Sequence, residues 1–191
     1  MHKVVFDIET KNTFSDIGSS NPGKLEISLL VVYDYATDQY LSFMEQDFSR
    51  LWKILENTDL IIGFNSDHFD IPVLNRYYPG DLTKIKSLDL LDALYRSLGR
   101  RVSLDMVAAG TLGTRKSGKG LDAIHWWKNG EIDKLRKYCT DDVRITKDIY
   151  EYALRHGELK YKLGGDVHTV PIDTRSWEVR VQTPLNYTLP F

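Results

Sequence analysis

The chain has 191 residues, of which 42% are hydrophobic and 27% are charged, and its formal net charge is −2. A chain of this length can bury a hydrophobic core without disulfides or a structural metal, so one domain is expected. The charge balance argues against a basic protein that coats duplex DNA, the single Cys139 excludes an internal disulfide, and no apolar run is long enough to span a membrane.

The amino-terminal part of the chain predicts three strands. Residues 4–9 (VVFDIE) are rich in β-branched and aromatic side chains and predict a strand, followed by a Gly/Ser/Asn/Pro-rich loop over residues 11–24. Residues 27–35 and 39–44 predict two further strands that pair as a hairpin.

The middle of the chain alternates helices with buried strands. Residues 48–57 have helical spacing, residues 60–64 form a short apolar run typical of a buried strand, and residues 71–78 predict a helix that stops at Pro79-Gly80. Residues 86–90 predict a short strand leading into a helix that ends at Gly99.

The remaining segments are mostly helical. Helices are expected from Ser103 to about residue 113, over residues 121–128, and over residues 132–155. We interpret residues 1–157 as one α/β domain, a mixed β-sheet flanked by α-helices. Residues 158–191 are predicted to be a carboxy-terminal extension, a hairpin or an extended arm, packed on the same domain.

Two acids, Asp7 and Glu9, lie two residues apart in the first predicted strand. Strand alternation places both on one face and the neighbouring apolar residues on the other. Buried acids need charged partners or a metal ion. The alternative, which this motif alone leaves open, is an edge strand whose outer face is wet.

The longest predicted helix carries an acid within its apolar stripe. At about 100° per residue, this stripe consists of Ile132, Leu135, Cys139, Val143, Thr146, Ile149 and Ala153. Asp142 falls inside the stripe, Asp141 falls on the expected solvent side, and Tyr138 lies one turn before Asp142. A carboxylate in such a stripe needs a basic partner or a metal ion, and the two acids of the first strand favour the metal.

A fourth acid, Asp70, stands where the predicted strand of residues 60–64 gives way to the next helix. Its simplest interpretation is a helix N-cap, with Pro72 in the first turn. We expect capping and metal binding to coexist at this residue.

These residues make up three motifs that resemble those of the DEDD superfamily of 3′–5′ exonucleases, whose members share the ribonuclease H-like fold. In chain order they are Asp7-Ile8-Glu9, the run from Asn65 through Phe69-Asp70 to Pro72, and Tyr138-x-x-x-Asp142. The tyrosine is typical of the DEDDy subgroup, because the histidine subgroup would carry His at Lys137. Residues 59–74 also look like the exonuclease domains of proofreading polymerases, and residues 103–113 resemble a helix of that group.

The resemblance implies catalysis by two divalent metal ions, Mg²⁺ or Mn²⁺, which prefer oxygen ligands. Asp7 would bridge both ions, while Glu9 and Asp142 would hold the ion that activates the water. Asp70 would support the second ion, and Tyr138 would orient the water through its hydroxyl, since a tyrosine pKa of about 10 makes a poor base at neutral pH. The products would be nucleoside 5′-monophosphates.

Candidate substrate contacts come from two segments, namely Asn65 and Phe69 of the second motif and Arg115, Lys116 and Lys119 of a glycine-rich loop. A core position is the favoured alternative for Phe69, and a solvated loop is an equal alternative for the basic residues. The loop is not interpreted as a nucleoside-triphosphate site, because Gly120 stands where that motif needs a hydroxyl and no strand precedes it.

Three functions follow from these features. The leading hypothesis is a 3′–5′ exonuclease whose partner is a single-stranded 3′ end of DNA or RNA. A catalytically silent nucleic-acid-binding module with the same fold is the alternative, and an endonuclease on RNA–DNA hybrids is a third candidate. No membrane association is expected, and the lone cysteine and the lack of a signal-peptide pattern favour the cytoplasm. A polymerase or helicase partner is left open.

Overall fold

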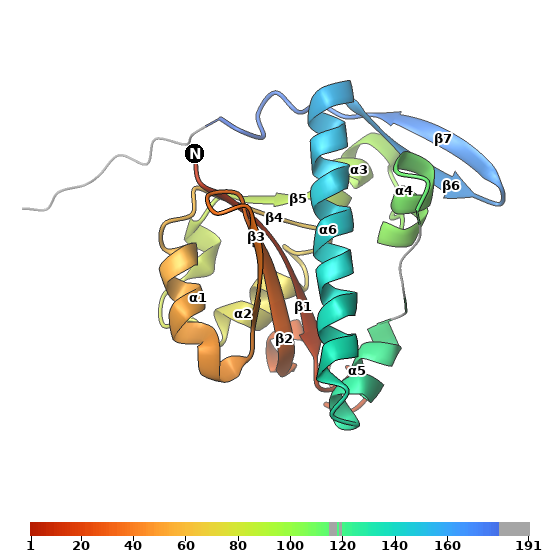
Figure 1. Cartoon of the computed structure of the whole chain (residues 1–191). Helices are drawn as coiled ribbons and strands as arrows, with labels where there is room; N and C mark the ends of the chain where they lie inside the picture. Colours follow the sequence, from red (N-terminus) through yellow and green to blue (C-terminus); the bar gives the residue numbers. More distant parts are fainter. Residues whose placement is uncertain (115–117, 119, 180–191) are drawn as a thin grey trace, which may run out of the picture.

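A five-stranded mixed sheet forms the centre of the structure, a computed structural model that describes residues 1–114, 118 and 120–179 (Figure 1). The strands are β1 (Lys3–Thr10), β2 (Ile27–Asp34), β3 (Gln39–Phe43), β4 (Leu60–Gly63) and β5 (Ser87–Asp89). Their order is β3-β2-β1-β4-β5. Strand β2 is antiparallel to both of its neighbours, β1 and β3, whereas β4 is parallel to β1 and β5 is parallel to β4.

Helices cover both faces of this sheet (Figure 1). They are α1 (Phe48–Leu55), α2 (Asp70–Asn75), α3 (Leu90–Leu98), α4 (Leu104–Thr111), α5 (Gly120–Lys128) and α6 (Ile132–His156). Short 3-10 turns are η1 (Pro22–Lys24), η2 (Glu45–Asp47) and η3 (Leu82–Lys84). The predicted α/β architecture, a mixed sheet flanked by helices, is confirmed. Within the described part of the chain, no helix combines the length and the apolar character that crossing a bilayer would require.

The sheet separates two hydrophobic cores. One core lies between the sheet and α1 and α2, and it contains Val4, Phe6 and Ile8 of β1. The other lies under α3, α4 and α6 and contains Val5 of β1. Strand alternation places Asp7 on the same face as Val5, toward α6. Because β1 is the middle strand of the sheet and Glu9 is buried, the interpretation of β1 as an edge strand with a wet outer face is wrong.

The long helix α6 follows its predicted stripe closely. Its buried residues are Leu135, Tyr138, Cys139, Asp142, Val143, Ile145, Thr146, Ile149, Tyr150 and Ala153. Ile132, at the start of the predicted stripe, is only partly buried. The helix ends at Gly157, which takes a left-handed φ of 65° and donates its N–H to the Ala153 carbonyl.

Helix α2 is shorter than the predicted residues 71–78 and ends at Asn75. Beyond this point the chain makes contacts that helical periodicity does not encode. The side-chain oxygen of Asn75 accepts from Leu82 N at 2.8 Å, and the Tyr77 hydroxyl accepts from Ile27 N at 3.2 Å. These bonds tie the segment to η3 and β2 instead of extending the helix.

The segment after α6 forms an antiparallel hairpin, β6 (Glu158–Leu163) and β7 (Asp166–Pro171), joined by two glycines with positive φ. Strand β6 lies close against α4, where a Cβ at Gly110 would come within 2.6 Å of the Tyr161 backbone. Farther on, Trp177 is buried and stacks on Tyr150 of α6, with ring centroids 5.8 Å apart.

Candidate active site

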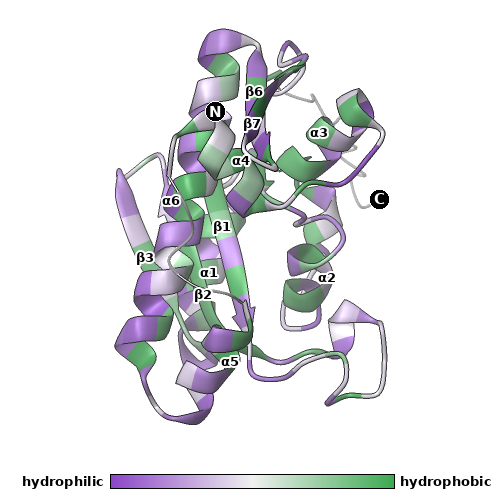
Figure 2. Cartoon of the chain, turned by 90° about the vertical axis from the view of Figure 1, so that its right-hand side faces the viewer, coloured by the Kyte–Doolittle hydropathy of each residue, from purple (hydrophilic) through white to green (hydrophobic). Residues whose placement is uncertain are grey.

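Four acids from distant parts of the chain gather around the second half of β1. Asp7 and Glu9 come from the second half of β1, Asp70 begins α2, and Asp142 comes from the middle of α6. In Figure 2, hydrophilic positions interrupt the otherwise hydrophobic ribbon of β1, which runs between α6 and α2. The parallel pairing of β1 with β4 explains this gathering, because the chain leaves β4 toward α2 at the same end of the sheet at which the acids of β1 lie.

Cys139 of α6 lies directly against the two acids of β1. One carboxylate oxygen from each of Asp7 and Glu9 and the Cys139 sulfur all lie within 4.8 Å of one another. The Cys139 thiol donates to both the backbone oxygen and Oδ2 of Asp7, each at 3.5 Å. Helix α6 therefore packs onto β1 at the acids, as the helical wheel predicts.

Asp142 is a third acid whose negative charge acts on the same thiol. Its side chain is buried, with a relative exposure of 2%, and it stands one turn after Cys139. Burial is the main reason why the pKa of the Cys139 thiol is raised, and the negative charges of Asp7, Glu9 and Asp142 raise it further. The three acids are thus close enough to act electrostatically on one point.

Asp70 joins this group from the opposite side of β1. It is 4% exposed, and its Oδ1 accepts from the backbone N–H of Ile8 at 3.0 Å. Burial raises its pKa well above the ordinary value, and the charge of Asp7 is the next largest cause. The predicted N-cap role is wrong, because Phe69 occupies the cap position and Asp70 is the first helical residue. The carboxylate is bound to β1 through Ile8 N, and it also interacts with the backbone N–H of Asp70 itself.

This donor set suits a hard divalent cation. The groups that converge are carboxylate oxygens, which Mg²⁺ and Mn²⁺ prefer. A buried acid whose pKa is raised by a neighbouring carboxylate, as that of Asp70 is by Asp7, is also stabilised when a cation neutralises the negative charge. Asp7 and Glu9 belong to the cluster that could hold an ion, while Asp70 and Asp142 flank it.

Tyr138, one helical turn before Asp142 on α6, is buried, with a relative exposure of 2%. Its ring packs edge-on against Trp126 of α5, with centroids 5.6 Å apart. Gly118 approaches both rings, and a Cβ there would lie 3.1 Å from Trp126 and 3.4 Å from Tyr138. Helix α5 therefore fixes the ring one turn before Asp142.

The candidate substrate contacts have different surroundings. Phe69 is partly buried against the core of the α1 and α2 face, and its ring meets Phe14 edge-on at 6.1 Å, which agrees with the core alternative. Asn65 takes a left-handed φ of 65°, and its side-chain oxygen accepts from the Arg101 guanidinium. Three other candidates lie outside the described residues, namely Arg115, Lys116 and Lys119.

Asp89, at the end of β5, is a buried acid that the sequence reading missed. Its carboxylate accepts from backbone N–H groups on both α3 and the loop before α2. A signal was available, since an aspartate directly before an apolar helical run is a typical N-cap. No pattern in the neighbouring sequence indicated the bonds from Asn65 N and Asp67 N.

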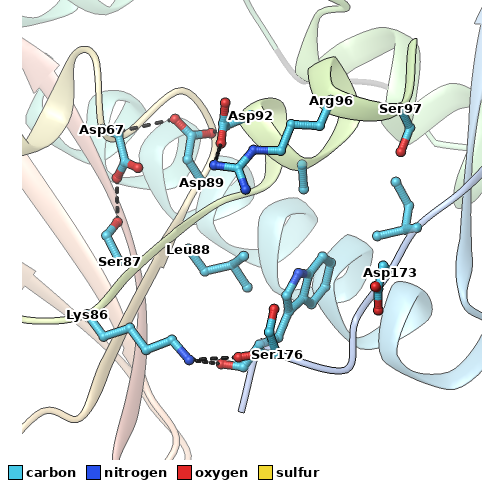
Figure 3. A pocket seen from close by; sticks show the side chains of 13 residues that line it. Asp67, Lys86, Ser87, Leu88, Asp89, Asp92, Arg96, Ser97, Asp173 and Ser176 are labelled. Carbon is cyan, nitrogen blue, oxygen red and sulfur yellow. Dashed lines mark hydrogen bonds and ion pairs between the residues drawn. The ribbon is translucent and has the colours of Figure 1, made fainter. Parts of the chain in front are cut away.

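A pocket of about 330 Å³ opens between β5, α3 and residues 172–177, next to Asp67 and Asp89 (Figure 3). Lys86 lies at its border and donates to the backbone oxygens of Ser176 and Trp177 at 2.8 and 2.9 Å. Asp92 and Arg96 of α3 pair across another wall at 2.6 Å. Its charged groups are thus largely engaged with one another or with the backbone.

Comparisons with known proteins agree with this architecture. The family model described as RNase_H superfamily matches residues 4–154, a range that includes all four acids. The structure is similar to that of the family B DNA polymerase from the hyperthermophilic archaeon Pyrobaculum calidifontis, with a TM-score of 0.60 and 20% sequence identity. The match covers 81% of this chain and 24% of that one, so the chain spans about a quarter of the polymerase's length. No curated protein matches the chain. The likeness in structure and the family match confirm the predicted ribonuclease H-like fold.

Proposed function

Because the chain belongs to the RNase H superfamily, we propose that it is a metal-dependent 3′–5′ exonuclease of the DEDDy type. The proposed reaction hydrolyses phosphodiester bonds from a single-stranded 3′ end and releases nucleoside 5′-monophosphates. The observation that carries the proposal is the convergence of the three motifs, with Asp7, Glu9 and Asp142 around one thiol and Asp70 across β1.

The four carboxylates are assigned to metal binding. Asp7 contacts Cys139 of α6, and its charge also raises the pKa of Asp70, so it would hold metal together with the acids of both α6 and α2. Glu9 and Asp142 would share the first ion, and Asp70 would support the second. Two Mg²⁺ or Mn²⁺ ions bound in this way would activate the attacking water and stabilise the leaving oxygen.

Tyr138 is assigned to the attacking water. Its ring is fixed by Trp126 and by the close approach of Gly118, so that its hydroxyl has few positions to sample. A hydroxyl held in one place can orient a water without a reorganisation cost in the transition state. Removal of the hydroxyl alone should therefore slow the reaction and leave the metal site intact.

The substrate is proposed to be a nucleic acid with a free 3′ end. Because the similar solved structure is a DNA polymerase, single-stranded DNA is the first substrate to test, followed by RNA. Asn65 and the basic loop residues Arg115, Lys116 and Lys119 remain proposed contacts to the strand.

The test uses single-stranded DNA and RNA oligonucleotides labelled at the 5′ end, with Mn²⁺, Mg²⁺ or EDTA. A 3′–5′ exonuclease shortens the labelled strand stepwise from its 3′ end, releases mononucleotides and stops when the 3′ end is blocked. Internal fragments that persist on 3′-blocked substrates would instead indicate an endonuclease. Binding of the labelled strand without cleavage in any metal would indicate a silent module. Asp142→Asn and Asp141→Asn form a matched pair of variants, since the two acids are neighbours in the chain but only Asp142 is assigned to the metal.

A further inference from the structure

The loop that joins β4 to α2 makes an unusually tight turn before Asp70. Its first part includes Asn65 in the left-handed region, a conformation that asparagine tolerates better than most residues. A Cβ at Gly63 would lie 2.4 Å from the Ser66 side chain, so the loop folds back directly onto the end of β4. Such a turn needs bonds from outside to hold it in place.

Asp89 of β5 supplies those bonds. Its Oδ1 accepts from Asn65 N at 2.8 Å and its Oδ2 accepts from Asp67 N at 3.2 Å. The same Oδ1 accepts from Leu91 N at 2.9 Å and from Asp92 N at 3.4 Å, which caps α3. Figure 3 shows Asp67 bonded to Asp89 on one side and to Ser87 on the other. One carboxylate, 4% exposed, therefore joins the loop to α3.

The held loop continues into Asp70 through short backbone bonds. Phe69 N donates to the Asn65 oxygen at 3.1 Å, and Ile71 N donates to the Ser66 oxygen at 2.9 Å. The two donors, Phe69 and Ile71, are the residues on either side of Asp70, so a shift of the loop would move the first turn of α2. Asp70 in turn binds Ile8 N, which lies between Asp7 and Glu9.

We propose that Asp89 is a positioning residue for the metal centre. By holding the loop of residues 64–69, Asp89 sets the position of Asp70 relative to Asp7. The inference rests on the metal-binding role given to Asp70 in the proposed function. Removal of a group that hydrogen-bonds to a metal ligand and orients it typically lowers metal affinity or activity by about 10–100-fold. A capping role alone would give no such change, because α3 contributes none of the proposed metal ligands.

Asp89→Ser separates the two roles of the carboxylate. Serine is a good N-cap and can still serve α3, but its single short hydroxyl cannot also serve Asn65 N and Asp67 N. Asp89→Asn is the conservative variant, since its side-chain oxygen can keep the Oδ1 bonds and only the acceptor for Asp67 N is replaced. The matched control is Asp34→Ser, which alters an equally buried acid that accepts from Ala36 N at 2.8 Å in the turn after β2.

Two readouts are compared for wild type and variants. The first is Mn²⁺ binding without substrate, measured by electron paramagnetic resonance. The second is the single-turnover cleavage rate as a function of Mn²⁺ concentration. For Asp89→Ser we expect the Mn²⁺ concentration at half-saturation to rise by roughly 10-fold or more in both readouts, with Asp89→Asn in between. Asp34→Ser should lower the melting temperature without changing Mn²⁺ affinity.

Unchanged Mn²⁺ affinity in a folded Asp89→Ser would overturn the proposal and leave Asp89 as a cap. If Asp89→Ser fails to fold, Asp89→Asn decides, and wild-type affinity in that variant overturns the proposal as well. A wild type that binds Mn²⁺ but cleaves no substrate contradicts the exonuclease function alone, since the binding readout still tests Asp89. A wild type that binds no Mn²⁺ overturns both.

Discussion

The two ends of β1 each lie next to a buried acid, and the contrast between them separates structural acids from candidate functional ones. Asp34, beside the first residues of β1, and Asp70, beside the last, are both 4% exposed. Asp34 accepts from Ala36 N at 2.8 Å and lies 2.7 Å from Nε2 of His2. Asp70 accepts from one amide of β1, but its charged neighbours include Asp7 and Asp89, which raise its pKa.

Burial of an acid alone therefore does not indicate a metal site. The charge of the groups around the buried acid is what distinguishes the two ends of β1. At the Asp34 end the protein itself supplies donors for the carboxylate. At the Asp70 end it gathers more negative charge, which is costly unless cations come from solution. The following predictions test this contrast, from the largest expected effect to the smallest.

Removal of an acid from the cluster should abolish cleavage without loss of the fold. For Asp7→Ala and Asp142→Ala we expect no detectable product, and in EDTA the melting temperature should hold or rise because repulsion among like charges is relieved. Asp34→Ala should instead destabilise, since it removes the acceptor for Ala36 N and the partner of the His2 ring, and a typical hydrogen bond contributes about 0.5–1.5 kcal/mol. Calorimetry in EDTA and single-turnover cleavage measure both effects. A large drop in melting temperature for both cluster variants would mean that these acids are structural.

Tyr138→Phe tests whether the Tyr138 hydroxyl takes part in the reaction or whether the side chain only packs against its neighbours. The variant keeps the ring contact with Trp126 and removes one hydroxyl. Loss of one preorganised group typically slows a reaction by ~10²-fold, and metal affinity should barely change. Single-turnover cleavage at saturating Mn²⁺, paired with a metal titration, gives the answer. A wild-type rate would remove the mechanistic support for the DEDDy assignment.

Asp70→Asn tests the charge of the cluster through pH. Since the pKa of Asp70 is raised in the folded protein, its neutral form stabilises the fold at low pH, and this stability is lost as pH rises through the folded pKa. In EDTA at neutral pH, Asp70→Asn should therefore melt above wild type, and the difference should shrink as pH falls toward the ordinary aspartate pKa of about 3.9. Saturating Mn²⁺ should reverse the order, because binding stabilises the wild type. A constant difference at all pH values would contradict the raised pKa.

Asp141→Asn should have the smallest effect. Asp141 pairs with Arg144 at 2.8 Å on the outer side of α6, and such pairs contribute about 0–1 kcal/mol. Cleavage should stay within a factor of about two of wild type by the same reasoning, since no contact with the cluster is lost. If Asp141→Asn were inactive and Asp142→Asn fully active, the two acids would have to exchange roles.

The face of the strand or helix on which each acid lies was predictable from the sequence. Alternation in β1 separates Asp7 and Glu9 from Phe6 and Ile8, and the helical wheel places Asp142 in the stripe that faces the sheet. These relations follow from the fixed periods of strand and helix, 2 and 3.6 residues. The sequence by itself therefore determined which faces carry the acids and the order in which the motifs come.

The tertiary structure alone decided how those faces meet. It placed β1 in the centre of the sheet, brought the Asp70 carboxylate within hydrogen-bond distance of Ile8 N, and ended α2 at Asn75. It also brought Asp89 to a loop 24 residues earlier in the chain. Such contacts depend on strand pairing and loop closure between distant segments, which leave no periodic trace in the chain. The sequence supplies the carboxylates and their faces, and the distances that would make them a metal centre arise only when the strands pair.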